Sequence, residues 1–120
     1  MVLVAVDDLL FSSKIRTVAK QAGVEVVFAR TPPEILDQLR TRKPALAIFD
    51  LNSSKTDPIG TVHAIRNDPE IAATRIVGFV SHVDAVTIAA ARQAGIDDVM
   101  ARSAFAGQLA EILLSAGDPG

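Results

Sequence analysis

The sequence predicts a doubly wound α/β fold built on a five-stranded parallel sheet. Five short apolar runs, rich in Val, Ile, Leu, Ala and Phe, alternate along the chain with five segments of helical periodicity. The runs are almost unbroken, which is typical of strands that helices cover on both faces. Strand–helix alternation of this kind is typical of doubly wound folds. The predicted strands are residues 2–6, 24–29, 45–50, 75–80 and 96–100.

The first two predicted helices have recognisable ends. After the first strand, apolar residues recur at helical spacing up to Ala22, and Gly23 stands where a helix C-cap belongs. We expect the second helix to begin after Thr31 as its N-cap, with Pro32 in the first turn. Glu34 would complete a capping box with Thr31.

The other three helices are predicted by similar signals. Asp57, followed by Pro58, is expected to cap the third helix in the same manner as Thr31. The fourth helix is expected over about residues 84–94, ending at Gly95. In the last helix, four apolar residues fall on one stripe. These are Phe105, Leu109, Ile112 and Leu113.

Length and composition indicate a single domain with its own hydrophobic core. The chain has 120 residues, of which 49% are hydrophobic and 22% charged. We expect one domain over residues 1–116, with residues 117–120 forming a tail or the start of a linker. A net charge of −2 offers no basic face for nucleic acid.

Cysteine content and hydropathy bear on location. The chain has no cysteine, which excludes disulfides and thiolate metal sites and fits a reducing compartment. No apolar run approaches the roughly 20 residues that a membrane helix requires. We therefore expect a cytoplasmic protein that does not contact a membrane.

Polar side chains follow the predicted strands. Asp7 and Asp8 follow the first strand, Asp50 ends the third, Ser81 follows the fourth and Arg102 follows the fifth. Ligands in doubly wound folds bind outside the carboxyl ends of the strands. We therefore expect three carboxylates, a hydroxyl and a guanidinium to meet at one edge of the sheet.

Three neighbouring carboxylates repel one another unless a cation neutralises them. Mg²⁺ suits such oxygen ligands, whereas the two isolated histidines, His63 and His82, offer no zinc set. The alternative is that Asp7 and Asp8 only cap the first helix and that Asp50 ends its strand in solvent. Ser81 and Arg102 at matching strand ends favour a functional cluster.

Short motifs at these strand ends occur in a characteristic order and spacing. They are Val6-Asp7-Asp8, Ile48-Phe49-Asp50-Leu51-Asn52, Val80-Ser81 and Gly95-Ile96-Asp97-Asp98, together with residues 89–95. In this arrangement the chain resembles bacterial two-component response-regulator receiver domains over essentially its whole length.

The resemblance implies a flavodoxin-like (βα)5 fold, sheet order 2-1-3-4-5, and a signalling role rather than an enzymatic one. A histidine kinase or His-containing phosphotransfer protein would phosphorylate Asp50. Asp8 and Asp50 would ligate Mg²⁺ directly, Asp7 through water and Asn52 through its backbone carbonyl. Ser81 would bond the phosphoryl oxygen. Homodimerisation or output would use the face of the fourth helix, fifth strand and fifth helix.

Several positions depart from the family pattern. Arg102 stands where receivers have a lysine, and a guanidinium is bulkier and planar. Val99 replaces the switch aromatic, and His82 replaces a small residue beside Ser81. The loop of residues 53–56 lacks the usual Met-Pro pair, and Pro58 replaces a glycine. We expect the acceptor chemistry to be retained and signal transmission to be altered.

Three hypotheses follow. The first is a phosphoacceptor receiver, in which phosphorylation of Asp50 changes a protein-interaction surface. The second is a pseudo-receiver, a phosphorylation-independent interaction module, which Arg102, His82 and Val99 favour. The third is a flavodoxin-like enzyme or cofactor binder. It is disfavoured because Asp7-Asp8-Leu9-Leu10 stands where such a protein needs a glycine-rich phosphate loop.

Overall fold

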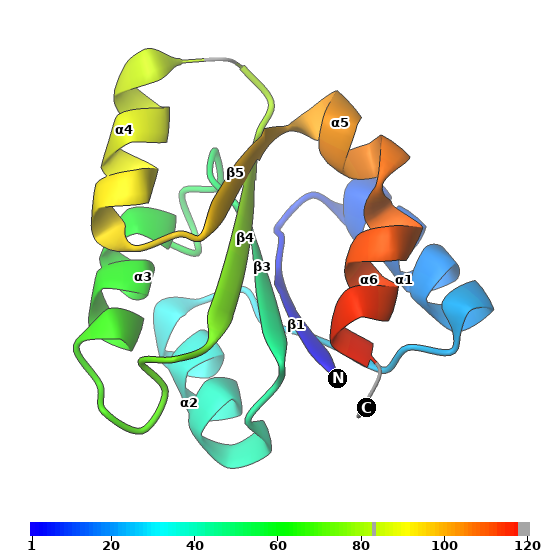
Figure 1. Cartoon of the computed structure of the whole chain (residues 1–120), viewed down its shortest axis with the longest axis horizontal. Coiled ribbons are helices and arrows are strands. Elements are labelled where there is room, and N and C mark those ends of the chain that lie inside the picture. The colour runs from blue at the N-terminus through cyan, green and yellow to red at the C-terminus, as the bar shows by residue number, and fades with distance from the viewer. Residues whose placement is uncertain (83, 118–120) are drawn as a thin grey trace.

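Five parallel strands form one sheet in the order β2-β1-β3-β4-β5 in the computed structural model of this chain (Figure 1). The structure describes residues 1–82 and 84–117. The predicted fold class and strand order are confirmed. The strands are β1 (Val2–Ala5), β2 (Val26–Phe28), β3 (Leu46–Asp50), β4 (Arg75–Val80) and β5 (Asp98–Ala101).

Helices cover both faces of the sheet (Figure 1). The helices α2, α3 and α4 lie on one face, and α1, α5 and α6 lie on the other. The winding reverses between β1 and β3, which are neighbours in the sheet. The helices are α1 (Leu9–Ala22), α2 (Pro32–Arg42), α3 (Pro58–Arg66), α4 (Ala85–Ala94), α5 (Arg102–Gly107) and α6 (Leu109–Gly117).

Two hydrophobic cores explain why the strands are apolar throughout. Successive side chains of a strand point to opposite faces, so each strand contributes to both cores. In β1, Leu3 packs in the core under α2, α3 and α4, whereas Val2 and Val4 pack in the core under α1, α5 and α6. Phe49 and Ile48 divide in the same way along β3.

The predicted helix boundaries hold at most ends. Gly23 and Gly95 adopt left-handed conformations at the C-caps of α1 and α4, with φ of 72° and 112°. Thr31 caps α2, its hydroxyl accepting a hydrogen bond from the Glu34 amide. The predicted capping box is altered, because the Glu34 carboxylate accepts from the amide of Arg30 at 2.6 Å instead of from Thr31.

The prediction for Asp57 is wrong in its mechanism. Asp57 precedes α3 but has a left-handed backbone with φ of 42°, and its side chain makes no capping hydrogen bond. An N-cap side chain normally reaches the helix amides from an extended backbone, which Asp57 does not have. Pro58 still occupies the first turn, where its missing N–H costs nothing.

β1 and β3 are each one residue shorter than predicted, and β2 and β5 begin two residues later than predicted because helix C-caps use their first residues. The Val24 amide bonds to the Ala19 carbonyl of α1, and the Ile96 amide bonds to the Ala91 carbonyl of α4. As a result, β2 begins at Val26 and β5 begins at Asp98.

The single predicted last helix is two helices, α5 and α6. Gly107 ends α5, and Gln108 interrupts the helix with φ of −109°. Glycine is a poor helix former, which favours a break there. The predicted apolar stripe continues across the two helices, because Phe105, Leu109 and Leu113 are all buried in one core. α6 ends at Gly117, and residues 118–120 of the predicted tail lie outside the described residues.

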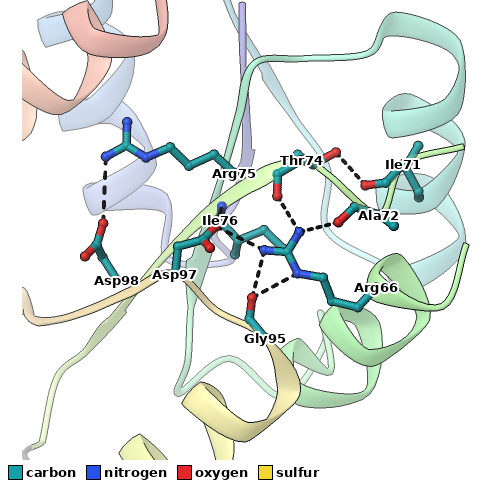
Figure 2. Close-up of polar contacts among 9 residues, drawn as sticks. All are labelled: Arg66, Ile71, Ala72, Thr74, Arg75, Ile76, Gly95, Asp97 and Asp98. Atoms are coloured by element: carbon teal, nitrogen blue, oxygen red, sulfur yellow. Dashed lines mark hydrogen bonds and ion pairs between the residues drawn. The ribbon is translucent and has the colours of Figure 1, made fainter. Parts of the chain in front are cut away.

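Arg66, the last residue of α3, connects three segments at the amino-terminal edge of the sheet (Figure 2). Its Nε and Nη2 donate to the carbonyl of Gly95, at 2.9 and 2.7 Å. Its Nη1 donates to the carbonyls of Ala72 and Thr74, and its Nη2 also bonds the carboxylate of Asp97. One side chain therefore holds the loop before β4 against the turn before β5.

In the part of the chain that the structure describes, no helix is both long and apolar enough to cross a membrane.

Candidate functional site

The predicted site residues lie at one edge of the sheet, where the carboxyl ends of the parallel strands meet. Asp50 is the last residue of β3, and the strand register places it beside Phe79 of β4. Ser81 directly follows β4, and Arg102 directly follows β5. The alignment of the strand ends explains how residues so far apart in sequence come together.

Asp50 is the most buried carboxylate of the group. It is only 8% exposed, and its Oδ1 accepts a hydrogen bond from the Asn52 amide at 2.9 Å. Burial raises the pKa of Asp50 above its ordinary value of 3.8, although the Asn52 hydrogen bond and the charge of Arg102 act in the opposite direction. The charges of Asp8 and Asp7 add to the rise, so both carboxylates lie near enough to repel Asp50.

Asp8 makes two kinds of contact. Its Oδ1 caps α1 by accepting from the amides of Leu10 and Phe11, at 2.9 and 3.2 Å. Its Oδ2 accepts from Nη2 of Arg102 at 3.0 Å. The Phe11 amide, followed by the Arg102 side chain, lowers the pKa of Asp8 below its ordinary value. Helix capping is thus real for Asp8, and it uses one oxygen only.

Arg102 is held on three sides. Besides its ion pair with Asp8, its guanidinium lies over the ring of Phe11, 4.3 Å from the ring centre. Its Nη1 lies 3.5 Å from Oγ of Ser81, a long hydrogen bond. The sequence predicted that Arg102 would reach this edge, but not that Phe11 would support it.

Asp7 also has a cationic neighbour, which the sequence analysis missed. Nζ of Lys55 lies 3.9 Å from Oδ1 of Asp7. Lys55 belongs to the loop between β3 and α3, and nothing in its sequence position shows that this loop turns back towards β1. Both carboxylates that follow β1 are therefore paired with side-chain cations.

The remaining predicted positions occupy the surrounding loops and β5. The side-chain oxygen of Asn52 accepts from the Ser81 amide at 2.7 Å, linking the loops after β3 and β4. The prediction had given Asn52 a role through its backbone only. His82 is exposed beside Ser81, and Val99 is partly buried against the core under α4.

The donor set fits a hard divalent cation in its chemistry but not in its present arrangement. Carboxylate and carbonyl oxygens of Asp8, Asp50 and Asn52 are the ligands that Mg²⁺ prefers. Among residues 1–82 and 84–117, however, no three acidic or histidine side chains are grouped so that they could hold a metal ion. Of these residues, Asp8 already has its Oδ2 engaged by Nη2 of Arg102.

A pocket of about 590 Å³ opens beside Arg102, between α1 and α5. Phe11 contributes to its apolar wall, and Lys14, Ser81 and Ser103 contribute polar groups. The pocket therefore presents two hydroxyls and two cations, groups that suit the binding of phosphoryl oxygens, although Asp50 is not among its lining residues.

A family model for the response regulator receiver domain matches residues 2–114 of this chain. No curated protein gives a significant match to the sequence.

Solved structures have the same fold. A response regulator from Hahella chejuensis is 23% identical with a TM-score of 0.83, the match covering 93% of this chain and 90% of that one. The phosphorylated cyanobacterial phytochrome response regulator RcpA is 22% identical with a TM-score of 0.79, covering 95% and 88%. The Mn²⁺-bound response regulator Rcp1 is 16% identical with a TM-score of 0.75, covering 95% and 88%.

Proposed function

The chain belongs to the response regulator receiver domain family, a signalling module of two-component systems, and from this premise we propose that Asp50 is its phosphoryl acceptor. The observation that carries the proposal is the setting of Asp50 at the carboxyl end of β3. Its Oδ1 is fixed by the Asn52 amide, which leaves Oδ2 for reaction. The phosphorylated state of RcpA, which shares the fold, gives the proposal a precedent.

The phosphoryl donor is a phosphohistidine of a histidine kinase or of a His-containing phosphotransfer protein. Oδ2 of Asp50 attacks the phosphorus atom, an O–P bond forms, and the N–P bond breaks as the imidazole nitrogen keeps the electron pair. Ser81 and Arg102 then offer a hydroxyl and N–H groups to the phosphoryl oxygens. A kinase partner of this kind would place the chain in the cytoplasm.

Asp8, Asp50 and the Asn52 carbonyl would hold Mg²⁺, with Asp7 acting through water. The bound ion supplies charge neutralisation for the three carboxylates and the phosphoryl group. The Mn²⁺ held by Rcp1 gives a precedent within the fold.

The proposed output surface is the face of α4, β5 and α5, where a homodimer partner or an output protein would bind. Val86 of α4 is 78% exposed, so α4 presents one large apolar side chain to solvent. Val99 of β5 has no aromatic ring, so we propose that any change there passes through the loops that Asn52 joins to Ser81.

Incubation with acetyl phosphate and Mg²⁺, followed by intact-mass spectrometry, tests the acceptor. We expect the parent chain to gain the mass of one phosphoryl group and Asp50→Asn to gain none. Asp84→Asn is the matched control, because Asp84 caps α4 and asparagine caps equally well. Labelling of Asp50→Asn to the same extent as the parent would contradict the assignment.

The raised pKa of Asp50 predicts a pH-dependent effect of Asp50→Asn on stability. An acid whose pKa is higher in the folded state destabilises that state increasingly as pH rises from 3.8 through the folded-state pKa. We therefore expect Asp50→Asn to be more stable than the parent at about pH 7, with a smaller difference at about pH 4. Urea denaturation followed by circular dichroism measures both.

Asp8→Asn provides a comparison of opposite sign. Because the pKa of Asp8 is lowered, its carboxylate stabilises the fold above the ordinary pKa of 3.8, and that contribution is lost as pH falls through the folded-state pKa. Asp8→Asn should therefore be less stable than the parent at about pH 7. If the stability difference from the parent varied with pH in the same way for both variants, burial of Asp50 and the hydrogen bonds of Asp8 would not shift the two pKa values in opposite directions.

The second candidate function is a pseudo-receiver that binds partners without phosphorylation. The ion pair between Arg102 and Asp8, at 3.0 Å, favours it because it engages a carboxylate that the metal needs. In this case the parent chain gains no mass with acetyl phosphate, and neither does Arg102→Lys.

Arg102→Lys separates the two candidates further. A lysine keeps the charge but has a compact ammonium group in place of the planar fork. We expect faster labelling of Asp50 in Arg102→Lys than in the parent if Asp50 is the acceptor, measured by the time course of mass gain. Unchanged or slower labelling would show that the guanidinium does not impede the reaction.

A further inference from the structure

We propose that Arg102 controls metal occupancy: its guanidinium and a divalent cation compete for the same oxygen, Oδ2 of Asp8. The inference rests on the proposed role of Asp8 as a metal ligand. It adds that metal binding and the Asp8–Arg102 ion pair exclude each other. We call the arrangement with this ion pair the closed state, and the arrangement in which a metal ion has replaced Arg102 on Asp8 the open state.

The first step of the argument is the limited number of free oxygens on Asp8. Oδ1 accepts from two amides at the start of α1, and losing these bonds would uncap the helix. Only Oδ2 can serve a cation without that cost, and it bonds Nη2 of Arg102 at 3.0 Å. A metal ion and the guanidinium cannot both take this position.

The second step is that Arg102 is held independently of Asp8. Its guanidinium lies 4.3 Å from the ring centre of Phe11, and Phe11 is itself packed 5.0 Å from the ring of Phe79 in the core. Stacking on a fixed aromatic ring restricts the side chain, so less conformational entropy is lost when it bonds Asp8. A lysine could also approach the Phe11 ring, but its ammonium has no planar group to stack on that ring.

The third step is that the released guanidinium has somewhere to go. The pocket beside Arg102 is lined by Phe11, Ser81 and Ser103, which together offer an aromatic face and two hydroxyls. Arg102 can leave Asp8 and remain in contact with protein groups there, so the open state does not require its full exposure to water.

Charge balance supports the same conclusion. Arg102 forms an ion pair with Asp8, and Lys55 forms one with Asp7. In the closed state, these two cations therefore neutralise the carboxylates that follow β1 without a metal ion. Asp50 is left as the buried carboxylate whose charge the closed state does not pair directly. Divalent cations therefore bind this chain more weakly than its three carboxylates alone would suggest.

Isothermal titration calorimetry with MgCl₂ alone, without a phosphodonor, tests the inference. We expect Arg102→Gln to bind Mg²⁺ about tenfold more tightly than the parent, a coupling within the usual range between competing ligands. Lys14→Gln is the matched control, because Lys14 is an exposed cation of the same pocket. Removal of the Lys14 charge should change the Mg²⁺ affinity by less than about twofold, because solvent and salt screen the charge of an exposed side chain.

A spectroscopic measurement separates competition from a general loss of positive charge. In the parent, saturating Mg²⁺ should shift the side-chain N–H signals of Arg102 in nuclear magnetic resonance spectra and speed their exchange with solvent. The same addition should leave the signals of Arg66 unchanged, because that side chain is bound at the opposite edge of the sheet.

Several results would overturn the inference. One is an equal Mg²⁺ affinity in Arg102→Gln and Lys14→Gln. Another is that the Arg102 N–H signals do not change when Mg²⁺ is added. A third is that neither the parent nor Arg102→Gln binds Mg²⁺. None of these depends on labelling of Asp50. Tighter binding in Arg102→Gln with no labelling of any variant would instead retain the competition and reject the phosphoacceptor function.

Discussion

Replacing Phe79 with alanine is expected to lower the free energy of unfolding by about 3–5 kcal/mol, the usual cost of emptying a core position that held a phenylalanine. Phe79 is fully buried in β4. Its ring stacks on Phe105 at 4.8 Å with an interplanar angle of 16°, and it lies 5.0 Å from Phe11. The cavity would lie beside the rings of Phe11 and Phe105, which cannot fill it unless α1 or α5 moves.

Guanidinium denaturation followed by circular dichroism measures this loss. Phe79→Leu fills most of the space and should cost no more than about 1.5 kcal/mol. Leu114→Ala is an exposed control, since Leu114 is 50% exposed on α6, and its cost should stay within about 0.5 kcal/mol. A loss below about 1 kcal/mol for Phe79→Ala would mean that the aromatic cluster repacks freely.

The second large effect is expected for Arg66→Ala, at about 3 kcal/mol, because removing a partly buried side chain that donates several hydrogen bonds leaves its acceptors unsatisfied. Arg66 is 23% exposed, and its guanidinium donates to the carbonyls of Gly95, Ala72 and Thr74 (Figure 2). It also bonds Asp97, which in turn accepts from the Ile76 amide at 2.8 Å.

Two variants make the Arg66 prediction specific. Arg66→Lys keeps the charge but cannot reach several carbonyls from one planar group, so it should recover less than half of the loss. Arg40→Ala removes an exposed ion pair with Asp68 and should cost less than about 1 kcal/mol. Urea denaturation measures all three, and similar losses for Arg66→Ala and Arg40→Ala would contradict the proposed role.

Residues that take their position directly from a strand end were predictable. Asp50, Ser81 and Arg102 meet because parallel strands bring their carboxyl ends to one edge, and an ordered set of apolar runs is enough to identify those ends. The helix stops at Gly23 and Gly95 were equally clear, since glycine takes the left-handed conformation at no steric cost.

Residues whose role depends on the path of a loop were not predictable. Lys55 reaches Asp7 only because the loop after β3 turns back over β1, and the aromatic support of Arg102 by Phe11 depends on how α1 and α5 pack. Asp97 is exposed, and its carboxylate also bonds Arg66 and the Ile76 amide, contacts that depend on how the turn before β5 lies against α3 and β4. The capping prediction for Asp57 failed because residue type alone does not give the backbone conformation.

The strand order β2-β1-β3-β4-β5 bears on how the chain can assemble during synthesis. β1 pairs with β2 on one side and with β3 on the other, so the amino-terminal half can form its own small sheet before later residues leave the ribosome. Each later strand then joins the growing sheet at the free side of β3 or β4, and none must be inserted between strands already paired. Growth from one side means that no strand pair already formed has to separate when a later strand joins.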